Sequence, residues 1–177
     1  MISTAFLTSL RTRLSNKRLL FIFGILFLVS QLLIVYIITP LDSGKLVQLQ
    51  TTFSVATFQQ IIADWEGQDL LYLFYRHQIF DLFLHPVWYS IFLGAGLALS
   101  MDAAKVIDKY NFALIIPFFA GMCDVSENTM HLILLTYPDF INSFTVTLSA
   151  CFANSKWFLV FVSSILIAYW SIRAKLK

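Results

Sequence analysis

Charged residues are scarce in this sequence. Asp, Glu, Lys and Arg make up 12% of the 177 residues, whereas a typical soluble domain contains about 25%. Hydrophobic residues make up 59%, which is more apolar surface than a soluble chain of this length can hide from water. The composition therefore excludes an ordinary soluble domain and predicts an integral membrane protein whose main partner is the lipid bilayer.

The sequence also lacks the features of several other protein classes. The net charge is only +2, and no basic run is interleaved with aromatic residues, so nucleic acid is not an expected partner. There are only two cysteines, Cys123 and Cys151, which are predicted to lie in the middle of one span and near the end of another. A disulfide between them is not expected on geometry.

Long apolar runs account for most of the chain. The first covers residues 19–39 without a charge, and a helix of that length reaches about 30 Å, the thickness of the hydrocarbon core. Basic residues precede it, as in a secretory signal, but no A-x-A-like cleavage site follows, so it is interpreted as an uncleaved span. Pro86 and Pro117 are expected to kink the second and third spans. The predicted spans are residues 19–39, 79–101, 111–136 and 156–172.

The two longer connections differ in character. In residues 40–80, Asp42 or Ser43 can cap a new helix, Gly67 interrupts it, and a further helix is expected from near Asp69 into the second span. Apolar residues recur at helical spacing and predict an amphipathic helix on the membrane surface or over the mouth of the bundle. Residues 137–155 are predicted to be a polar loop. The expected buried face of the amphipathic helix is Val47, Ser54, Phe58, Ile61, Ile62 and Trp65.

Lys and Arg are distributed unevenly between the two sides of the predicted bundle. Nine lie in the N-terminal segment, the 102–110 link and the C-terminal tail, and three lie on the other side when Lys156 is counted there. The positive-inside rule then places both termini in the cytoplasm of a multi-pass cell-membrane protein. The prediction is an all-α fold with a single domain, residues 1–177. It forms a four-helix transmembrane bundle with the amphipathic helix in its first external loop.

Ionisable side chains interrupt the middle two spans. In the third span, Asp124, Glu127, Asn128 and His131 follow i, i+3, i+4, i+7 spacing, which places them on one helical face. Such groups cost several kcal/mol in lipid, so this face is expected to turn into the bundle.

The second span offers partners for this face. Spans two and three are joined by a short link and are therefore expected to be antiparallel neighbours. Depth counted from their outer ends predicts a polar pocket in the outer half of the bundle. The expected pairs are His131 with Asp81, Glu127 with His85 and Asp124 with Tyr89. The expected binding residues are Asp81, Tyr89, Asn128, His131 and, from the first span, Gln31.

Acid–base chemistry is the most specific interpretation of this cluster. Asp124 and Glu127 lie one turn apart, so in a medium of low dielectric constant one of them is expected to hold a proton. Beside the imidazole of His85 they form a candidate catalytic acid/base set. A metal is not favoured, because the sequence contains no H-E-x-x-H motif. The simpler alternative is that these side chains only hold the helices together by hydrogen bonds.

Two segments carry a resemblance to known sequences. Residues 75–89 (YRHQIFDLFLHPVWY) and 117–128 (PFFAGMCDVSEN) resemble a group of small, uncharacterised bacterial four-span inner-membrane proteins with D-x-x-E-N in the third span. The resemblance covers about half of the chain. It implies a bacterial inner-membrane location and no known activity.

Three functions remain open from the sequence. The first is an intramembrane acid/His pocket for a small amphipathic or lipid-like molecule, with or without catalysis. The second is a non-enzymatic subunit or scaffold of a larger membrane complex, with contacts through the small residues of the 94–100 segment. The third is a proton or metal carrier, which would need a homo-oligomer. The sequence does not reveal whether a cofactor is bound.

Overall fold

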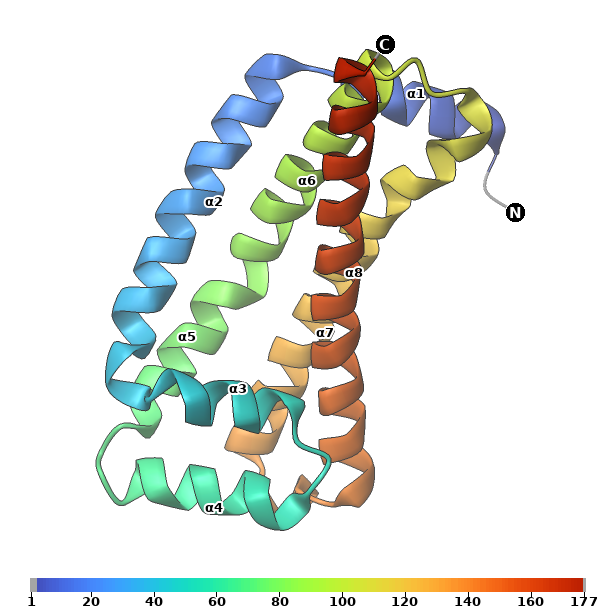
Figure 1. Cartoon of the computed structure of the whole chain (residues 1–177). Coiled ribbons are helices and arrows are strands. Elements are labelled where there is room, and N and C mark those ends of the chain that lie inside the picture. The colour runs from blue at the N-terminus through green and yellow to red at the C-terminus, as the bar shows by residue number, and fades with distance from the viewer. Residues whose placement is uncertain (1–2, 177) are drawn as a thin grey trace.

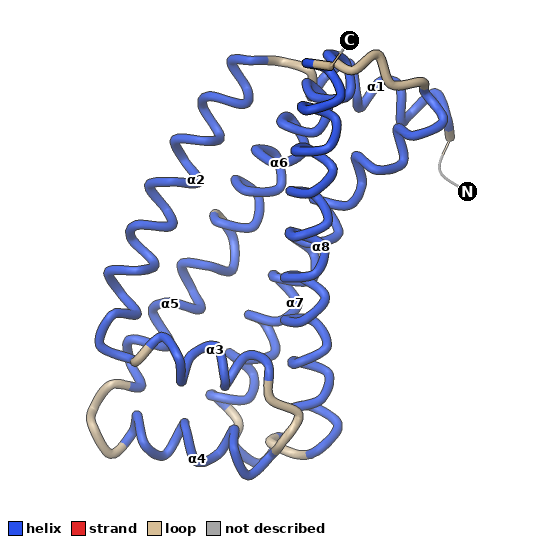
Figure 2. The backbone as a smooth tube through the Cα atoms, viewed as in Figure 1, coloured by secondary structure: helices blue, strands red, loops and turns tan. Residues whose placement is uncertain are grey.

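The computed structural model describes residues 3–176 and confirms the all-α prediction. Within that range there are eight α-helices and no strand (Figure 2). The helices are α1 (Thr4–Leu14), α2 (Lys17–Ile38), α3 (Ser43–Thr51), α4 (Val55–Glu66), α5 (Leu71–Phe83), α6 (His85–Ala103), α7 (Ile116–Thr136) and α8 (Ser143–Lys175).

The long helices form an elongated bundle. Figure 1 shows α2, the α5–α6 pair, α7 and α8 running lengthwise, with α3 and α4 lying across one end and α1 across the other. Helix α6 is central, because α2, α7 and α8 all pack against it. The start of the described chain and the end of α8 lie at the same end of the bundle (Figure 1).

Two helices are long and apolar enough to cross a membrane, and the α5–α6 pair makes a third if it is one bent span. The first two are Lys17–Leu41 and Ser143–Lys175, and the pair bends by 44° at Leu84. The predicted kink at Pro86 is therefore confirmed, since proline favours the first turn of a helix and cannot continue the preceding one. Helix α7 is not among these candidates, because its polar face lowers its hydropathy.

Pro117 does not kink the third predicted span. Helix α7 begins only at Ile116, so Pro117 lies in its first turn, where a missing backbone N–H costs no hydrogen bond. The preceding segment, Asp108–Ile115, is 3₁₀-helical. The predicted start of this span at residue 111 is thus wrong for the α-helix.

The predicted loop at residues 137–155 is mostly helix, which is a second correction. Asn142 and Thr145 form a reciprocal capping box that starts α8 at Ser143. No glycine or proline follows before Lys175, so nothing interrupts the helix for 33 residues. Lys156, predicted to lie at the boundary of the fourth span, is therefore in the interior of a helix.

The amphipathic segment consists of two helices instead of one. Asp42 caps α3, as expected, but the chain breaks after Thr51 and Ser54 caps a second helix, α4. Val47 is 52% exposed and does not belong to the buried face, whereas Phe58 does, as predicted. The two helices cover the mouth of the bundle through a shared apolar cluster of Leu41, Leu46, Leu49, Phe58, Ile61, Trp65, Leu73, Phe74, Leu134 and Val146.

Polarity in the bundle is inverted relative to a soluble protein. Large apolar side chains face outward along α2 and α8, and Tyr36 is 81% exposed. Asp124, Glu127 and His131 are instead fully enclosed. A second apolar cluster, including Leu97, Met101, Leu114 and Trp170, lies toward the α1 end. The polar side chains therefore form a layer between two apolar clusters, as expected for a bundle in lipid.

The N-terminal helix is fastened to the connection between α6 and α7. Arg11 Nε donates to Asp102 (2.7 Å), and its Nη1 donates to the Val106 carbonyl (2.8 Å) and to Asn111 (2.9 Å). Ser15 also bonds Asp102. Arg11 is thus part of the folded structure, which hydropathy alone did not indicate.

Close approach of α6 and α7 depends on Gly121. A Cβ there would collide with the Ser90 hydroxyl and meet the Pro86 carbonyl at 3.1 Å. We expect Gly121→Ala to destabilise the protein by about 1–3 kcal/mol, because overpacking outweighs the better helix propensity of alanine. Thermal unfolding of the purified protein measures this. Gly94→Ala is the matched control, since its Cβ would meet only side chains at ordinary distance, and an equal loss in both variants would contradict the prediction.

Candidate functional site

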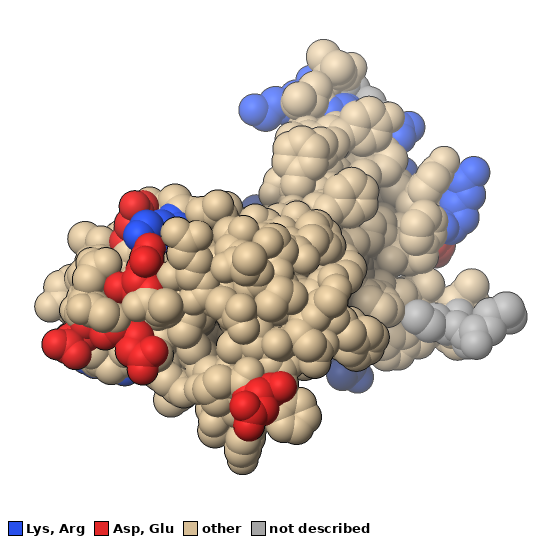
Figure 3. All heavy atoms as spheres, turned by 90° about the horizontal axis from the view of Figure 1, so that it is seen from below, with Lys and Arg blue, Asp and Glu red and all other residues tan. Residues whose placement is uncertain are grey.

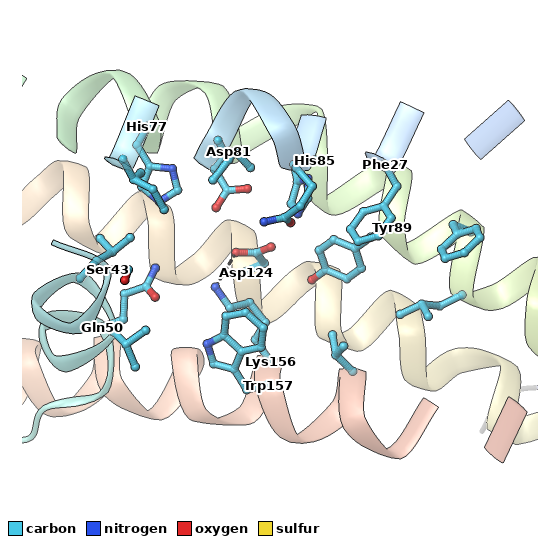
Figure 4. A pocket seen from close by; sticks show the side chains of 18 of the residues that line it. Phe27, Ser43, Gln50, His77, Asp81, His85, Tyr89, Asp124, Lys156 and Trp157 are labelled. Carbon is cyan, nitrogen blue, oxygen red and sulfur yellow. Dashed lines mark hydrogen bonds and ion pairs between the residues drawn. The ribbon is translucent and has the colours of Figure 1, made fainter. Parts of the chain in front are cut away.

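A cavity of about 440 Å³ lies in the polar layer of the bundle. It is bounded by α2, α3, the α5–α6 pair and α8, and α7 contributes Asp124 (Figure 4). The polar lining residues are Gln31, Ser43, Gln50, His77, Asp81, His85, Tyr89, Asp124, Lys156 and Ser164. Of the predicted site residues, the structure therefore brings Gln31, Asp81, His85, Tyr89 and Asp124 to one cavity.

Lys156 is the main partner of the acidic residues on α7. Its Nζ lies 3.0 Å from Asp124 Oδ1 and 2.6 Å from Glu127 Oε2. Asn128 also donates to Asp124 Oδ1, at 3.2 Å. The lysine is buried, and Figure 4 shows its amine pointing at the Asp124 carboxylate. One buried cation thus forms ion pairs with two carboxylates that would otherwise have no cationic partner.

Sequence reasoning missed Lys156 because it placed this residue at the outer end of a span. The signal was present in the sequence, since Asn142 is a strong helix cap and the following residues contain no helix breaker. Extending the helix back to Asn142 would have moved Lys156 into the bundle. It would also have placed it near Asp124.

The remaining polar residues of α7 are buried, as expected, but they lie behind the cavity wall. Glu127 contacts Lys156, and its Oε1 lies 3.9 Å from His131 Nδ1. His131 Nε2 is 3.0 Å from the Ser149 hydroxyl. Neither these two residues nor Asn128 lines the cavity. The expected partners therefore change: α8 supplies Lys156 to Glu127 and Ser149 to His131, in place of His85 and Asp81 from the second span.

The α5–α6 wall carries a stripe of ionisable and aromatic side chains. His85 opens α6 directly after the bend, and its Nδ1 is 2.7 Å from the Ser30 hydroxyl of α2. Its ring lies against Phe27 and Tyr89, at 5.5 and 5.4 Å between centroids. His77, which sequence reasoning did not select, extends the stripe by two turns.

Several polar atoms of this wall have no hydrogen-bond partner among the described residues. They are both ring nitrogens of His77, Oδ1 of Asp81 and the hydroxyl of Tyr89. The three side chains are 3%, 5% and 5% exposed. Buried polar groups are nearly always hydrogen-bonded in native proteins. These groups therefore indicate that the cavity holds something polar.

The other part of the cavity is apolar and lies at the side of the bundle. Ile34 of α2, Phe92 and Leu93 of α6, and Trp157 and Val160 of α8 line it. Helices α2 and α8 both pack against α6 but have no substantial contact with each other. The apolar part therefore lies between two helices that leave a gap.

No family model, no curated protein and no solved structure matches this chain. Any function must therefore be argued from the site itself. Within residues 3–176, no three His, Cys, Asp or Glu side chains are grouped so that they could hold a metal ion. Cys123 and Cys151 are both free thiols.

Proposed function

We propose that the protein is an integral membrane protein that crosses the bilayer four times, through α2, the α5–α6 pair, α7 and α8. The proposal adds α7 to the candidate spans. Its 21 residues reach about 32 Å, enough for a hydrocarbon core. It packs against α5, α6 and α8, and its acids face Lys156 and not lipid. Four crossings also agree with both ends of the described chain lying together (Figure 1).

The charges at the two ends support a cytoplasmic position for the α1 end. Acidic residues dominate the α3–α4 end, onto which Figure 3 looks. With Lys156 in the interior, only Lys45 and Arg76 remain as basic residues on that side. The opposite end carries Arg11, Arg13, Lys17, Arg18, Lys105, Lys109, Arg173 and Lys175. The positive-inside rule then favours cytoplasmic termini, and the resemblance noted above favours a bacterial inner membrane.

The function that the site supports best is binding of a small amphipathic or lipid-like molecule. One observation supports this proposal. A single cavity joins an apolar part to a polar part, where buried His77, Asp81 and Tyr89 have polar atoms without a geometrically formed hydrogen bond. Its volume lies within the range of small-molecule sites, about 300–1,000 Å³. Asp124 and Lys156 form its ionic wall. Glu127 acts as a positioning residue, since it reaches the cavity only through Lys156.

A cavity-filling substitution tests this function. Val160→Trp should occupy the apolar part of the cavity, so a single-tailed amphiphile that stays bound to the purified wild type should be lost from the variant. Mass spectrometry of the purified protein measures the retained molecule. Ile165→Trp on the exposed side of α8 is the matched control and should retain it. Identical retained molecules in all three proteins would overturn the proposal.

The scaffold function has less support. The small residues of the 94–100 segment, its expected contact surface, are already used inside the chain. Gly94 faces Leu14 and Phe118, and Gly96 faces Ile167 and Leu20. A partner would therefore need a different surface.

A further inference from the structure

We propose that the head group of the bound molecule is a protonated primary or secondary amine. This inference rests on the proposed function, because it assumes that an amphiphile occupies the cavity. It follows from the charge balance of the cavity wall and from the polar atoms that lack partners.

The polar layer has more carboxylates than cations. Asp81, Asp124 and Glu127 are all buried in it, and Lys156 is its only lysine or arginine among the lining residues. Lys156 is already engaged with Asp124 and Glu127. Asp81 makes no ion pair in the described chain, although Lys156 and Asn128 are close enough to influence it. A buried carboxylate without a cation is costly, so a positively charged ligand stabilises this site.

The polar atoms without hydrogen-bond partners at Asp81 and His77 indicate which type of cation would bind. Asp81 Oδ1 and a ring nitrogen of a neutral His77, one helical turn apart on α5, can each accept a hydrogen bond, while the Tyr89 hydroxyl interacts with Asp124. A primary or secondary ammonium group offers at least two N–H donors, so one group can serve both acceptors. A quaternary ammonium group has the charge but no N–H donor. A hydroxyl group donates once and brings no charge, and a carboxylate or phosphate would face like charges.

The apolar part of the cavity indicates the hydrophobic portion of the expected ligand. Phe27, Phe92 and Val160 also line the cavity, and their side chains are apolar. A single alkyl tail placed there would lie along the gap between α2 and α8. A second tail would have to lie outside the cavity, so the expected ligand is a single-chain amine.

A series of ligands with the same tail tests the head group. Dodecylamine, dodecyltrimethylammonium, dodecanol and dodecanoate are titrated into the full-length protein in phosphatidylcholine nanodiscs, and tryptophan fluorescence reports binding. Equal tails keep partition into the bilayer comparable. We expect dodecylamine to bind at least tenfold more tightly than each of the other three, and Asp81→Asn to remove that advantage while dodecanol binding stays unchanged.

Three further variants complete the design. Asp139→Asn changes an exposed acid at the same end of the bundle, so it should leave amine binding unchanged and reveal any effect of surface charge. If Asp81→Asn fails to fold, His77→Phe, which removes only one acceptor, should still weaken amine binding severalfold more than it weakens dodecanol binding. Val160→Trp should abolish binding of the whole series.

The outcomes separate this inference from the function on which it rests. If dodecanol or dodecanoate binds as tightly as dodecylamine and Val160→Trp abolishes both, the head-group inference is overturned and the cavity remains a binding site. If dodecyltrimethylammonium equals dodecylamine, the requirement for N–H donors is overturned. If no ligand shows saturable binding that Val160→Trp removes, both proposals are overturned.

Discussion

Replacing Lys156 with methionine is expected to destabilise the protein by about 3–5 kcal/mol, because it leaves two buried carboxylates without their cation. Asp124 and Glu127 lie 3.0 and 2.6 Å from Nζ, and the described chain brings no second lysine or arginine into contact with either. Methionine keeps most of the apolar length of the side chain, so the loss reports mainly on the charge. Equilibrium or thermal unfolding of the purified variant in detergent measures it.

Two controls separate charge from shape in this experiment. Combining Lys156→Met with Asp124→Asn and Glu127→Gln removes all three charges and should recover most of the lost stability, since a fully neutral buried set carries no unpaired ion. Lys45→Met breaks a pair of similar length, 2.9 Å to Asp64, but at a partly exposed site, and should cost less than about 1 kcal/mol. A Lys156→Met variant as stable as Lys45→Met would show that the buried ion pairs do not hold the bundle together.

A proline at Cys151 is expected to cost about 3 kcal/mol or more. Cys151 lies in the third turn of α8 and is exposed, so replacing its side chain removes few packing contacts. Proline would remove the backbone N–H that α8 needs there and would clash with the Thr147 carbonyl. It would also displace Lys156 from Asp124, because both depend on the direction of the same helix. Unfolding measurements on the purified variant give the cost.

Cys151→Ala is the matched substitution for that proline and should change stability by less than about 0.5 kcal/mol. If residues 137–155 formed a loop, as the sequence alone indicated, the proline would be tolerated as well as the alanine. Equal stability of the two variants would therefore contradict the continuous helix.

The sequence predicted best those parts of the fold where a single property, such as hydropathy or a proline, points to one structure. Residues 19–39 contain no charged residue, and Pro86 has no alternative to bending the second span. Residues 143–155 mix Thr, Ser and Asn with apolar side chains, so their hydropathy resembles a loop. Their helix is fixed by the Asn142 cap and by Val146, Ala150 and Ala153, which are buried inside the structure. A hydropathy average over a short stretch of sequence cannot reveal such contacts between distant segments.

The part of the candidate site that lies on a single helix, α7, was predictable from the sequence. The spacing of Asp124, Glu127, Asn128 and His131 correctly indicated a buried face. The error lay in the choice of neighbour, because counting depth along two spans ignored the third element that packs against α7. His77 was overlooked for a related reason: it lies in a stretch that its length and polarity marked as external.

The length of α8 has a consequence for how a molecule could reach the cavity. Lys156 is seventeen residues from Arg173, about 26 Å along the helix, while a hydrocarbon core is about 30 Å thick. Because Lys156 pairs with Asp124, which lies twelve residues, about 18 Å, from the outer end of α7, its ammonium lies near the middle of the core that α7 is proposed to cross, and the last turns of α8 extend beyond the inner face. Helices α3 and α4 lie across the outer end of the bundle (Figure 1). An amphiphile of the proposed kind would then enter sideways from the acyl chains, between α2 and α8, and not from the aqueous end of the bundle that α3 and α4 cover.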